Sequence, residues 1–313
     1  MGESLADHLW SARLLVHEAG RRRIQDVHKA YAEAGANILT SAAYQASYAG
    51  FSQAGLRDEQ IDDLLLASTS MCREVAGDCL VAASVGPYGA ALADGSEYTG
   101  AYDRDADGLR EWHLRRLRKL VASRPDFLAL ETIPSAEEVR GLLEALQVIR
   151  AEGDAPLPPA WLSMSVKDAD GGVVLASGER LDEVVHFVCA QDLASAGRGR
   201  LIEILGVNCC KPALATRAIR IVRQAMAHAA AGQTSEQQER RIIVYSNRGE
   251  DWDPHSKSWV GTGPEEASDL EYAAEAKRWI DAGASIIGGC CRTTPDTIGQ
   301  LSSTLTNQGG SLP

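Results

Sequence analysis

Two stretches of the chain decide its fold: Leu201-Ile202-Glu203-Ile204-Leu205-Gly206-Val207-Asn208-Cys209-Cys210 and Ala284-Ser285-Ile286-Ile287-Gly288-Gly289-Cys290-Cys291. Each is a short apolar run that predicts a strand, followed by glycine or asparagine and then by thiols. Neither run alternates with polar residues, which is typical of a parallel sheet buried on both faces. Ligands bind beside the C-terminal ends of such strands, so we expect these thiols at one functional edge.

Outward from these stretches, apolar runs alternate with amphipathic runs at helical spacing. Regular alternation of this kind gives a parallel sheet, and at 313 residues the natural closure is a (β/α)8 TIM-type barrel. Seven strands are expected, whereas the barrel has eight. The chain opens with a helix, so the first strand is the one expected to be missing. The expected strands are 37–41, 79–85, 126–131, 161–166, 201–208, 241–246 and 284–287, and the expected helices include 5–16, 21–34, 58–75, 109–123, 181–190, 212–230 and 268–282.

Local signals mark helix ends and connections. Ser135 followed by Glu138 predicts a capping box at the start of a helix that runs to about residue 151. Residues 168–178 are rich in Gly and Asp and predict a loop, and residues 231–240 predict a solvated insertion. Residues 250–266 form a long connection, which more often serves as an active-site flap than as a plain linker.

Composition excludes several classes of function. A net charge of −12 argues against a nucleic-acid or membrane-surface partner. The seven cysteines are odd in number, and no signal peptide or bilayer-spanning stretch is visible. We therefore expect a cytoplasmic protein with reduced thiols. Three of the cysteines, Cys72, Cys79 and Cys189, are interpreted as small buried apolar residues.

The remaining thiols predict a metal site. Cys209, Cys290 and Cys291 would offer three thiolates to a soft cation and leave its fourth position open, as in a catalytic zinc site. An alternative adds Cys210 and closes the site as a structural one. A redox role for the adjacent pair Cys290-Cys291 lacks the usual Cys-x-x-Cys spacing.

Several motifs resemble those of the homocysteine S-methyltransferases, which are zinc-dependent (β/α)8 enzymes. Gly206-Val207-Asn208-Cys209 and Gly288-Gly289-Cys290-Cys291-Arg292-Thr293-Thr294-Pro295 resemble the two zinc signatures of the family. Its third-, fourth- and seventh-strand motifs are similar to Ser84-Val85-Gly86-Pro87-Tyr88-Gly89-Ala90, Leu130-Glu131-Thr132-Ile133-Pro134 and Tyr245-Ser246-Asn247. The resemblance runs from about Leu5 to the final helix, and the two cysteine motifs together are highly specific.

This resemblance implies a reaction and a site. It implies Zn²⁺ held by Cys209, Cys290 and Cys291, and transfer of a methyl group from a sulfonium donor (S-methylmethionine or S-adenosylmethionine) to the homocysteine thiol, giving methionine. Glu131 is expected to bind the amino group of homocysteine. The other expected substrate-binding residues are Asn208, Asn247, Tyr88 and Gly289. For the asparagines, backbone hydrogen bonding is the competing interpretation, and for Tyr88 it is core packing.

The chain departs from the family pattern at its start. Members of the family begin with a strand that carries Asp-Gly-Gly, and no such segment precedes Leu9-Trp10-Ser11-Ala12. We therefore expect residues 1–313 to form a single homocysteine-binding barrel domain that is incomplete at its N-terminus. The alternative is a catalytically impaired or inactive barrel that retains a zinc or thiol site. The sequence does not indicate the oligomeric state.

Overall fold

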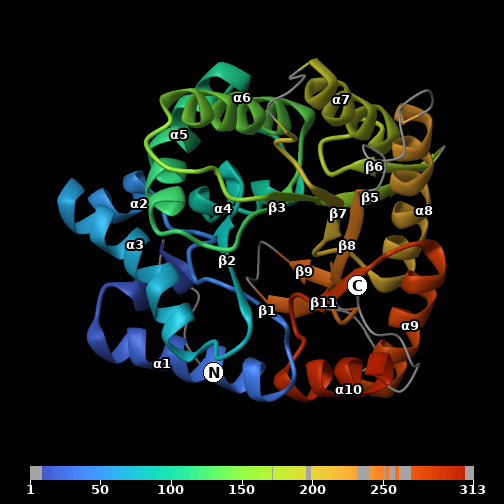
Figure 1. Cartoon of the computed structure of the whole chain (residues 1–313), viewed down its shortest axis with the longest axis horizontal. Coiled ribbons are helices and arrows are strands. Elements are labelled where there is room, and N and C mark those ends of the chain that lie inside the picture. The colour runs from blue at the N-terminus through green and yellow to red at the C-terminus, as the bar shows by residue number, and fades with distance from the viewer. Residues whose placement is uncertain are drawn as a thin grey trace. The chain divides into compact units, whose positions relative to one another are not determined.

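The computed structural model describes residues 9–170, 172–194, 199–230, 240–249, 251–253, 258–260 and 269–306. The chain divides into two compact units: Met1–Ala32 with Asn37–Ala160 (unit 1), and Glu33–Ala36 with Trp161–Pro313 (unit 2). Figure 1 labels most of the helices and strands of both. Within the described residues, seven strands pair in parallel and alternate with helices, which confirms the α/β class. None of the helices in this part of the chain is long and apolar enough to cross a bilayer.

Unit 1 contains three parallel strands in the order β1-β2-β3. Ala82 of β2 pairs with Thr40 of β1 on one side and with Phe127 of β3 on the other. Leu128 and Leu130 of β3 have no exposed surface, as expected for strands covered on both faces. The elements are η1 (Trp10–Leu15), α1 (Glu18–Glu33), β1 (Ile38–Thr40), α2 (Tyr48–Gln53), α3 (Asp58–Val75), β2 (Leu80–Val85), α4 (Tyr88–Leu92), η2 (Ser96–Tyr98), α5 (Ala106–Ala122), β3 (Phe127–Ile133) and α6 (Ala136–Glu152).

Unit 2 contains four parallel strands in the order β4-β7-β8-β11. The middle strand β8 therefore separates the two strands that end in thiols, and α8 packs against β7 and β8 (Figure 1). Pro212 occupies the first turn of α8, where its missing N–H costs nothing. The elements are β4 (Ala160–Met164), β5 (Val166–Ala169), β6 (Gly172–Leu175), α7 (Leu181–Ala194), β7 (Ile204–Asn208), α8 (Pro212–Ala229), β8 (Arg241–Ser246), β9 (Asp251–Asp253), β10 (Ser258–Val260), α9 (Asp269–Ala282), β11 (Ile286–Gly289) and α10 (Pro295–Thr306).

The loop prediction for residues 168–178 is wrong for 168–169 and 172–175, which belong to the antiparallel hairpin of β5 and β6, whereas 176–178 form a turn as predicted. Val173 and Leu175 alternate with more exposed neighbours and are buried, so the strand period outweighs the Gly and Asp content. The predicted long connection 250–266 contains a second antiparallel pair, β9 with β10. Its remaining residues, and 231–239 of the predicted insertion, lie outside the described residues. Of the predicted first helix, the described part is the 3-10 turn η1.

The predicted capping box at Ser135 is half correct. The Ser135 side chain accepts a hydrogen bond from the backbone N–H of Glu138 (3.2 Å), as an N-cap does. The Glu138 carboxylate, however, has no exposed surface and binds other groups of unit 1. The prediction that it would bind back to the N-cap residue is therefore wrong. The competing partners of this carboxylate are the backbone N–H of Tyr88 and the imidazole of His113.

Candidate metal centre

Three thiols of unit 2 meet beyond the C-terminal ends of β7 and β11. The sulfurs of Cys209, Cys290 and Cys291 all lie within 4.8 Å of one another. The Cys209 sulfur is 3.7 Å from that of Cys291, and the two sulfurs of the adjacent pair are 3.9 Å apart. The structure therefore brings together the three cysteines that the sequence singled out as metal ligands.

The end of β8 sets the spacing of the two thiol-bearing segments. Two strands that flank a third lie about 9 to 10 Å apart, so thiols on β7 and β11 can meet only by reaching over β8. Backbone atoms of residues 245–248 bind one segment and then the other in alternation. These hydrogen bonds are Cys209 N to Tyr245 O (3.1 Å), Cys290 N to Ser246 O (2.9 Å), Asn247 N to Cys210 O (2.9 Å) and Arg248 N to Cys291 O (3.1 Å).

Unusual backbone conformations turn the chain at both segments. Cys209 has φ 53° and Arg292, next to Cys291, has φ 68°. Residues other than glycine rarely adopt these left-handed values, which cost of order 1–3 kcal/mol each and persist when the surroundings hold them. At Cys209 the turn ends the strand at the residue whose thiol reaches the other two.

The sulfur positions fit a tetrahedral thiolate site. Zinc–sulfur bonds of about 2.3 Å at tetrahedral angles require sulfurs about 3.8 Å apart. The two separations of 3.7 and 3.9 Å bracket that value. Cys210 is buried but lies outside the group of three, which leaves the fourth position of such a site to another donor.

The electrostatics of the cluster also favour a cation. A hydrogen bond with the neighbouring Cys209 thiol is the largest cause that raises the pKa of Cys290 and of Cys291 well above the usual value, and charge on Cys209 raises both further. Burial is the largest cause that raises the pKa of Cys210, and the neighbouring Cys209 adds to it. Three ionised sulfurs at these distances therefore need a positive charge between them, and a soft divalent cation supplies it.

Three of the predicted substrate-binding residues lie beside the thiols in unit 2. Asn247 follows β8 directly, and its side-chain Oδ1 is buried with no hydrogen-bond partner among the described residues. Asn208 is fully buried at the end of β7, opposite Tyr245. A Cβ on Gly289 would come within 2.4 Å of the Thr293 hydroxyl, so this position requires glycine for space. Of the three, Asn247 offers an acceptor that still lacks a donor.

Glu131 and Tyr88, the other two predicted substrate-binding residues, belong to unit 1. The Glu131 carboxylate on β3 is 8% exposed and accepts a hydrogen bond from the Ser84 hydroxyl on β2. The next residue, Thr132, has φ 60°. The Tyr88 ring packs edge-to-face on Tyr102 and on Trp112, with centroids 5.3 and 5.2 Å apart. These packing contacts agree with the core interpretation of Tyr88, and its substrate role stays a prediction.

A buried ionic network behind Tyr88 was missed by the sequence reasoning. Glu138 accepts hydrogen bonds from the Tyr88 backbone N–H (2.5 Å) and from His113 Nε2 (2.8 Å). Arg116 donates to Gly86 O (2.6 Å) and lies 3.1 Å from His113 Nδ1. The network therefore holds both ends of the Gly86–Tyr88 turn.

Burial decides the charge states in this network. It lowers the pKa of His113 to about 4, so the contact between His113 and Glu138 is a hydrogen bond from a neutral imidazole rather than an ion pair. It also lowers the pKa of Arg116 to about 10, which leaves the guanidinium charged at neutral pH. A signal was present in the sequence, because His113 and Arg116 share the helical face of Leu109, Leu117 and Leu120.

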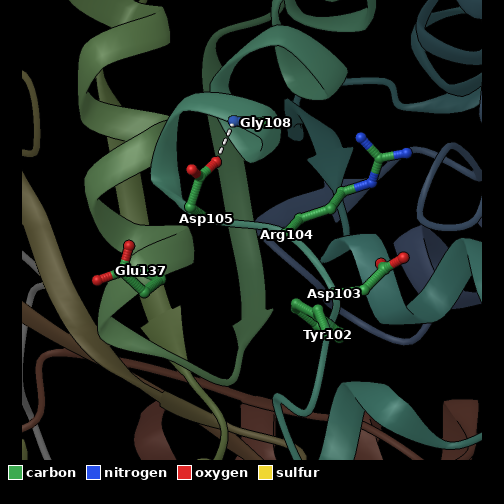
Figure 2. A pocket seen from close by; sticks show the side chains of 6 residues that line it. All are labelled: Tyr102, Asp103, Arg104, Asp105, Gly108 and Glu137. Carbon is green, nitrogen blue, oxygen red and sulfur yellow. Dashed lines mark hydrogen bonds between the residues drawn. The ribbon is translucent and has the colours of Figure 1, made fainter.

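A cavity of about 710 Å³ lies at the N-terminal end of α5 in unit 1 (Figure 2). Its carboxylates already serve the helix: Asp105 accepts from Gly108 N (2.9 Å) and Glu137 accepts from Ala106 N (3.1 Å). None of the predicted site residues lines it. The lining residues are Tyr102, Asp103, Arg104, Asp105, Gly108 and Glu137.

Comparisons with known proteins agree on one family. The family model described as homocysteine S-methyltransferase matches residues 1–305. Homocysteine S-methyltransferase 1 of Zea mays is 35% identical over 327 residues, which cover 99% of this chain and 91% of the maize protein. Homocysteine S-methyltransferase YbgG of Bacillus subtilis (strain 168) is 35% identical over 314 residues, or 96% of this chain and 88% of its own.

Solved structures give the same result. The metallated form of the homocysteine methyltransferase MmuM from Escherichia coli is 32% identical and superimposes with a TM-score of 0.74. The match covers 96% of this chain and 90% of that one. Its oxidized form superimposes with a TM-score of 0.75 at the same identity.

Proposed function

Because this chain belongs to the homocysteine S-methyltransferase family of enzymes, we propose that it methylates the thiol of homocysteine with the help of zinc held by Cys209, Cys290 and Cys291. The observation that carries the proposal is the pair of sulfur separations, 3.7 and 3.9 Å, that suit one tetrahedral ion. The existence of a metallated form of the relative MmuM supports the binding of a metal by this chain.

The chemistry explains why three thiolates suit this reaction. Zinc, when bound, lowers the pKa of a coordinating thiol, so that the substrate sulfur is a thiolate near neutral pH. Three cysteine ligands leave one position for that sulfur. The combined negative charge of the three cysteines would keep electron density on the substrate sulfur, which would attack the methyl carbon of a sulfonium donor in line, with the neutral thioether as leaving group.

The predicted substrate-binding residues would orient the amino acid. We assign the ammonium of homocysteine to the buried Glu131 carboxylate, on the family resemblance, with Ser84 keeping that carboxylate in one orientation. The Oδ1 of Asn247, which has no hydrogen-bond partner in the described part of the chain, is suited to accept a hydrogen bond from an N–H of the substrate. Asn208, Tyr88 and Gly289 complete the proposed set.

The methyl donor in this proposal is S-methylmethionine or S-adenosylmethionine. Both carry a sulfonium charge, which the net charge of −12 attracts. The two donors are told apart by measuring methionine formation with each as the sole methyl source. Turnover with neither would remove the sulfonium assignment.

Metal analysis of cysteine variants tests the core of the proposal. The protein purified from zinc-containing medium is expected to hold about one zinc per chain, and Cys209→Ala or Cys291→Ala is expected to lose both the metal and methionine formation. The matched control is Cys210→Ala, an adjacent buried thiol outside the group of three. Cys72→Ala, in unit 1, is a remote control. Unchanged metal content in Cys209→Ala would contradict the proposal, and metal without turnover would favour the alternative of an inactive barrel.

The role of Glu131 needs a separate measurement. Glu131→Gln keeps the shape of the side chain and removes its charge, so the KM for homocysteine is expected to rise about 10-fold or more, as for loss of a charge-assisted hydrogen bond. Zinc content is expected to stay unchanged. An unaltered KM would refute the ammonium assignment without touching the metal proposal.

The domain organisation is also a proposal. We infer that residues 1–313 work as one homocysteine-binding domain of the TIM-barrel type, as the family resemblance and the seven parallel strands suggest. A single cooperative urea transition, identical by fluorescence and circular dichroism, is expected. Reading the transcript upstream of Met1 tests the expectation about a first strand with Asp-Gly-Gly.

A further inference from the structure

We propose that Tyr272 and Trp279 of α9 are positioning residues of the metal centre, because they hold the two thiol-bearing segments at the separation that a single cation requires. The inference rests on the proposed metal function. It concerns groups that contact neither the metal nor the substrate, and it explains how neutral side chains fix the sulfurs before any ion binds.

Tyr272 fixes the segment that leads to Cys290. Its hydroxyl donates to Ser246 O (2.9 Å) and lies 3.2 Å from Gly288 O and 3.1 Å from Ser246 Oγ. The same Ser246 carbonyl accepts the backbone N–H of Cys290 (2.9 Å). One phenol therefore joins the end of β8 to the end of β11, directly before the adjacent thiols.

Trp279 fixes the other segment. Its indole N–H donates to Pro212 O (3.2 Å), in the first turn of α8 and three residues after Cys209. Trp279 has no exposed surface and Tyr272 is 2% exposed, so water does not replace either bond. The two residues are seven apart on α9, which places them on one face of the helix.

The two side chains act as one rigid body. Their rings pack edge-to-face, with centroids 5.4 Å apart and an interplanar angle of 81°. Cys209 and Cys291 extend from strands that are not neighbours, and the backbone hydrogen bonds of residues 245–248 tie each thiol-bearing segment to the end of β8 but not to the other segment. Contacts from α9 to both sides restrict their separation further, and groups that orient metal ligands without contacting the metal typically change its affinity 10- to 100-fold.

Cobalt binding to the full chain tests the proposal. Co²⁺ in a thiolate site gives an intense sulfur-to-cobalt charge-transfer absorbance. Titration in the presence of a chelator that competes for Co²⁺ gives the affinity of the site for the metal. Tyr272→Phe keeps the ring and removes the hydroxyl, and Trp279→Phe removes the indole N–H. Each is expected to weaken Co²⁺ binding about 10- to 100-fold and to shift the charge-transfer band, because the sulfurs relax from their spacing.

The matched control is Tyr245→Phe, since Tyr245 is also buried in unit 2 and its hydroxyl binds Trp161 and Ser163 on β4. It is expected to bind Co²⁺ like the parent chain, even where its metal-free form is less stable to heat. If Tyr272→Phe and Trp279→Phe bind Co²⁺ with the affinity and the absorbance spectrum of the parent chain, the proposal that these residues position the thiols is wrong. Should one variant fail to fold, the other decides. A parent chain that binds no Co²⁺ would overturn the metal function itself, which is a different result.

Discussion

The two units hold their predicted site residues by different means. In unit 2 the thiol segments are tied by backbone amides, a phenol and an indole, all of which are neutral. In unit 1 the Gly86–Tyr88 turn is tied by a buried carboxylate and a buried guanidinium that are joined through a neutral imidazole. A centre that must itself take up charge is best surrounded by neutral donors, whereas buried ions need each other to offset their lost hydration.

The largest effect is expected on removing a charge from the buried ionic network of unit 1. Glu138→Ala is expected to lower the free energy of unfolding by about 3–5 kcal/mol, because the guanidinium of Arg116, 1% exposed, would remain buried without its counter-charge. Urea denaturation measures the change. The control is Glu144→Ala on the same helix, where loss of a partly exposed pair with Arg110 is expected to cost less than about 1 kcal/mol. Equal losses in the two variants would contradict the ionic network.

Removal of metal tests the thiol segments of unit 2, which neutral groups hold in place. Treatment with a chelator is expected to lower the free energy of unfolding by about 3 kcal/mol when free metal had been 100-fold above its dissociation constant. The loss is expected to be local, so hydrogen exchange should speed up at the ends of β7, β8 and β11 and stay constant in β2 and β3. Uniform acceleration in both units would show that the metal stabilises the whole chain and not the thiol segments.

Acid should act on unit 1 first. Burial lowers the pKa of His113 and of His28, both in unit 1, to about 4 in the folded protein. The unfolded chain, with an ordinary histidine pKa near 6.5, then binds more protons, so stability is full above that value and falls as the pH drops toward 4. The loss is about 2 kcal/mol per histidine at pH 5.

Urea denaturation at pH 7.5 and pH 5 checks this sign. His113→Asn, which has no imidazole to protonate, is expected to lose about half of the pH dependence, since His28 retains its share. Hydrogen exchange at pH 5, corrected for intrinsic rates, should rise in β2 and β3 before it rises in β8. An unchanged pH dependence in His113→Asn would mean that this imidazole is not buried in neutral form.

The smallest expected effect separates the helix cap at Ser135 from the ionic network around Glu138. Ser135→Ala is expected to cost about 1 kcal/mol, the usual value for a lost N-cap, because only the bond from Glu138 N to Ser135 Oγ is made. Ser135→Thr keeps a capping oxygen and is expected to stay within about 0.5 kcal/mol of the parent. Thermal or urea unfolding measures both. A loss as large as that of Glu138→Ala would indicate that the cap and the ionic network are one unit.

Much of the fold was predictable because the spacing of apolar residues, and the succession of strands and helices along the chain, can be read from short stretches of sequence. The predicted helix 58–75 coincides with α3, and the apolar runs became parallel strands. The hairpin β5–β6 was missed because its Gly and Asp content outweighed a short alternation of Val173 and Leu175. The capping-box signal at Glu138 failed because a stronger set of partners lies far away in the sequence, on α5 and at Tyr88.

The sequence by itself determined that three thiols follow strands whose C-terminal ends share one edge, since parallel strands with helical crossovers allow no other placement. Only the tertiary structure decided which thiol stays out, Cys210, and what holds the others apart at 3.7 and 3.9 Å. Contacts such as Trp279 to Pro212 join residues 67 positions apart. The spacing of apolar residues along a helix determines which face it buries. Which residues that face contacts depends on how the neighbouring helices and strands pack.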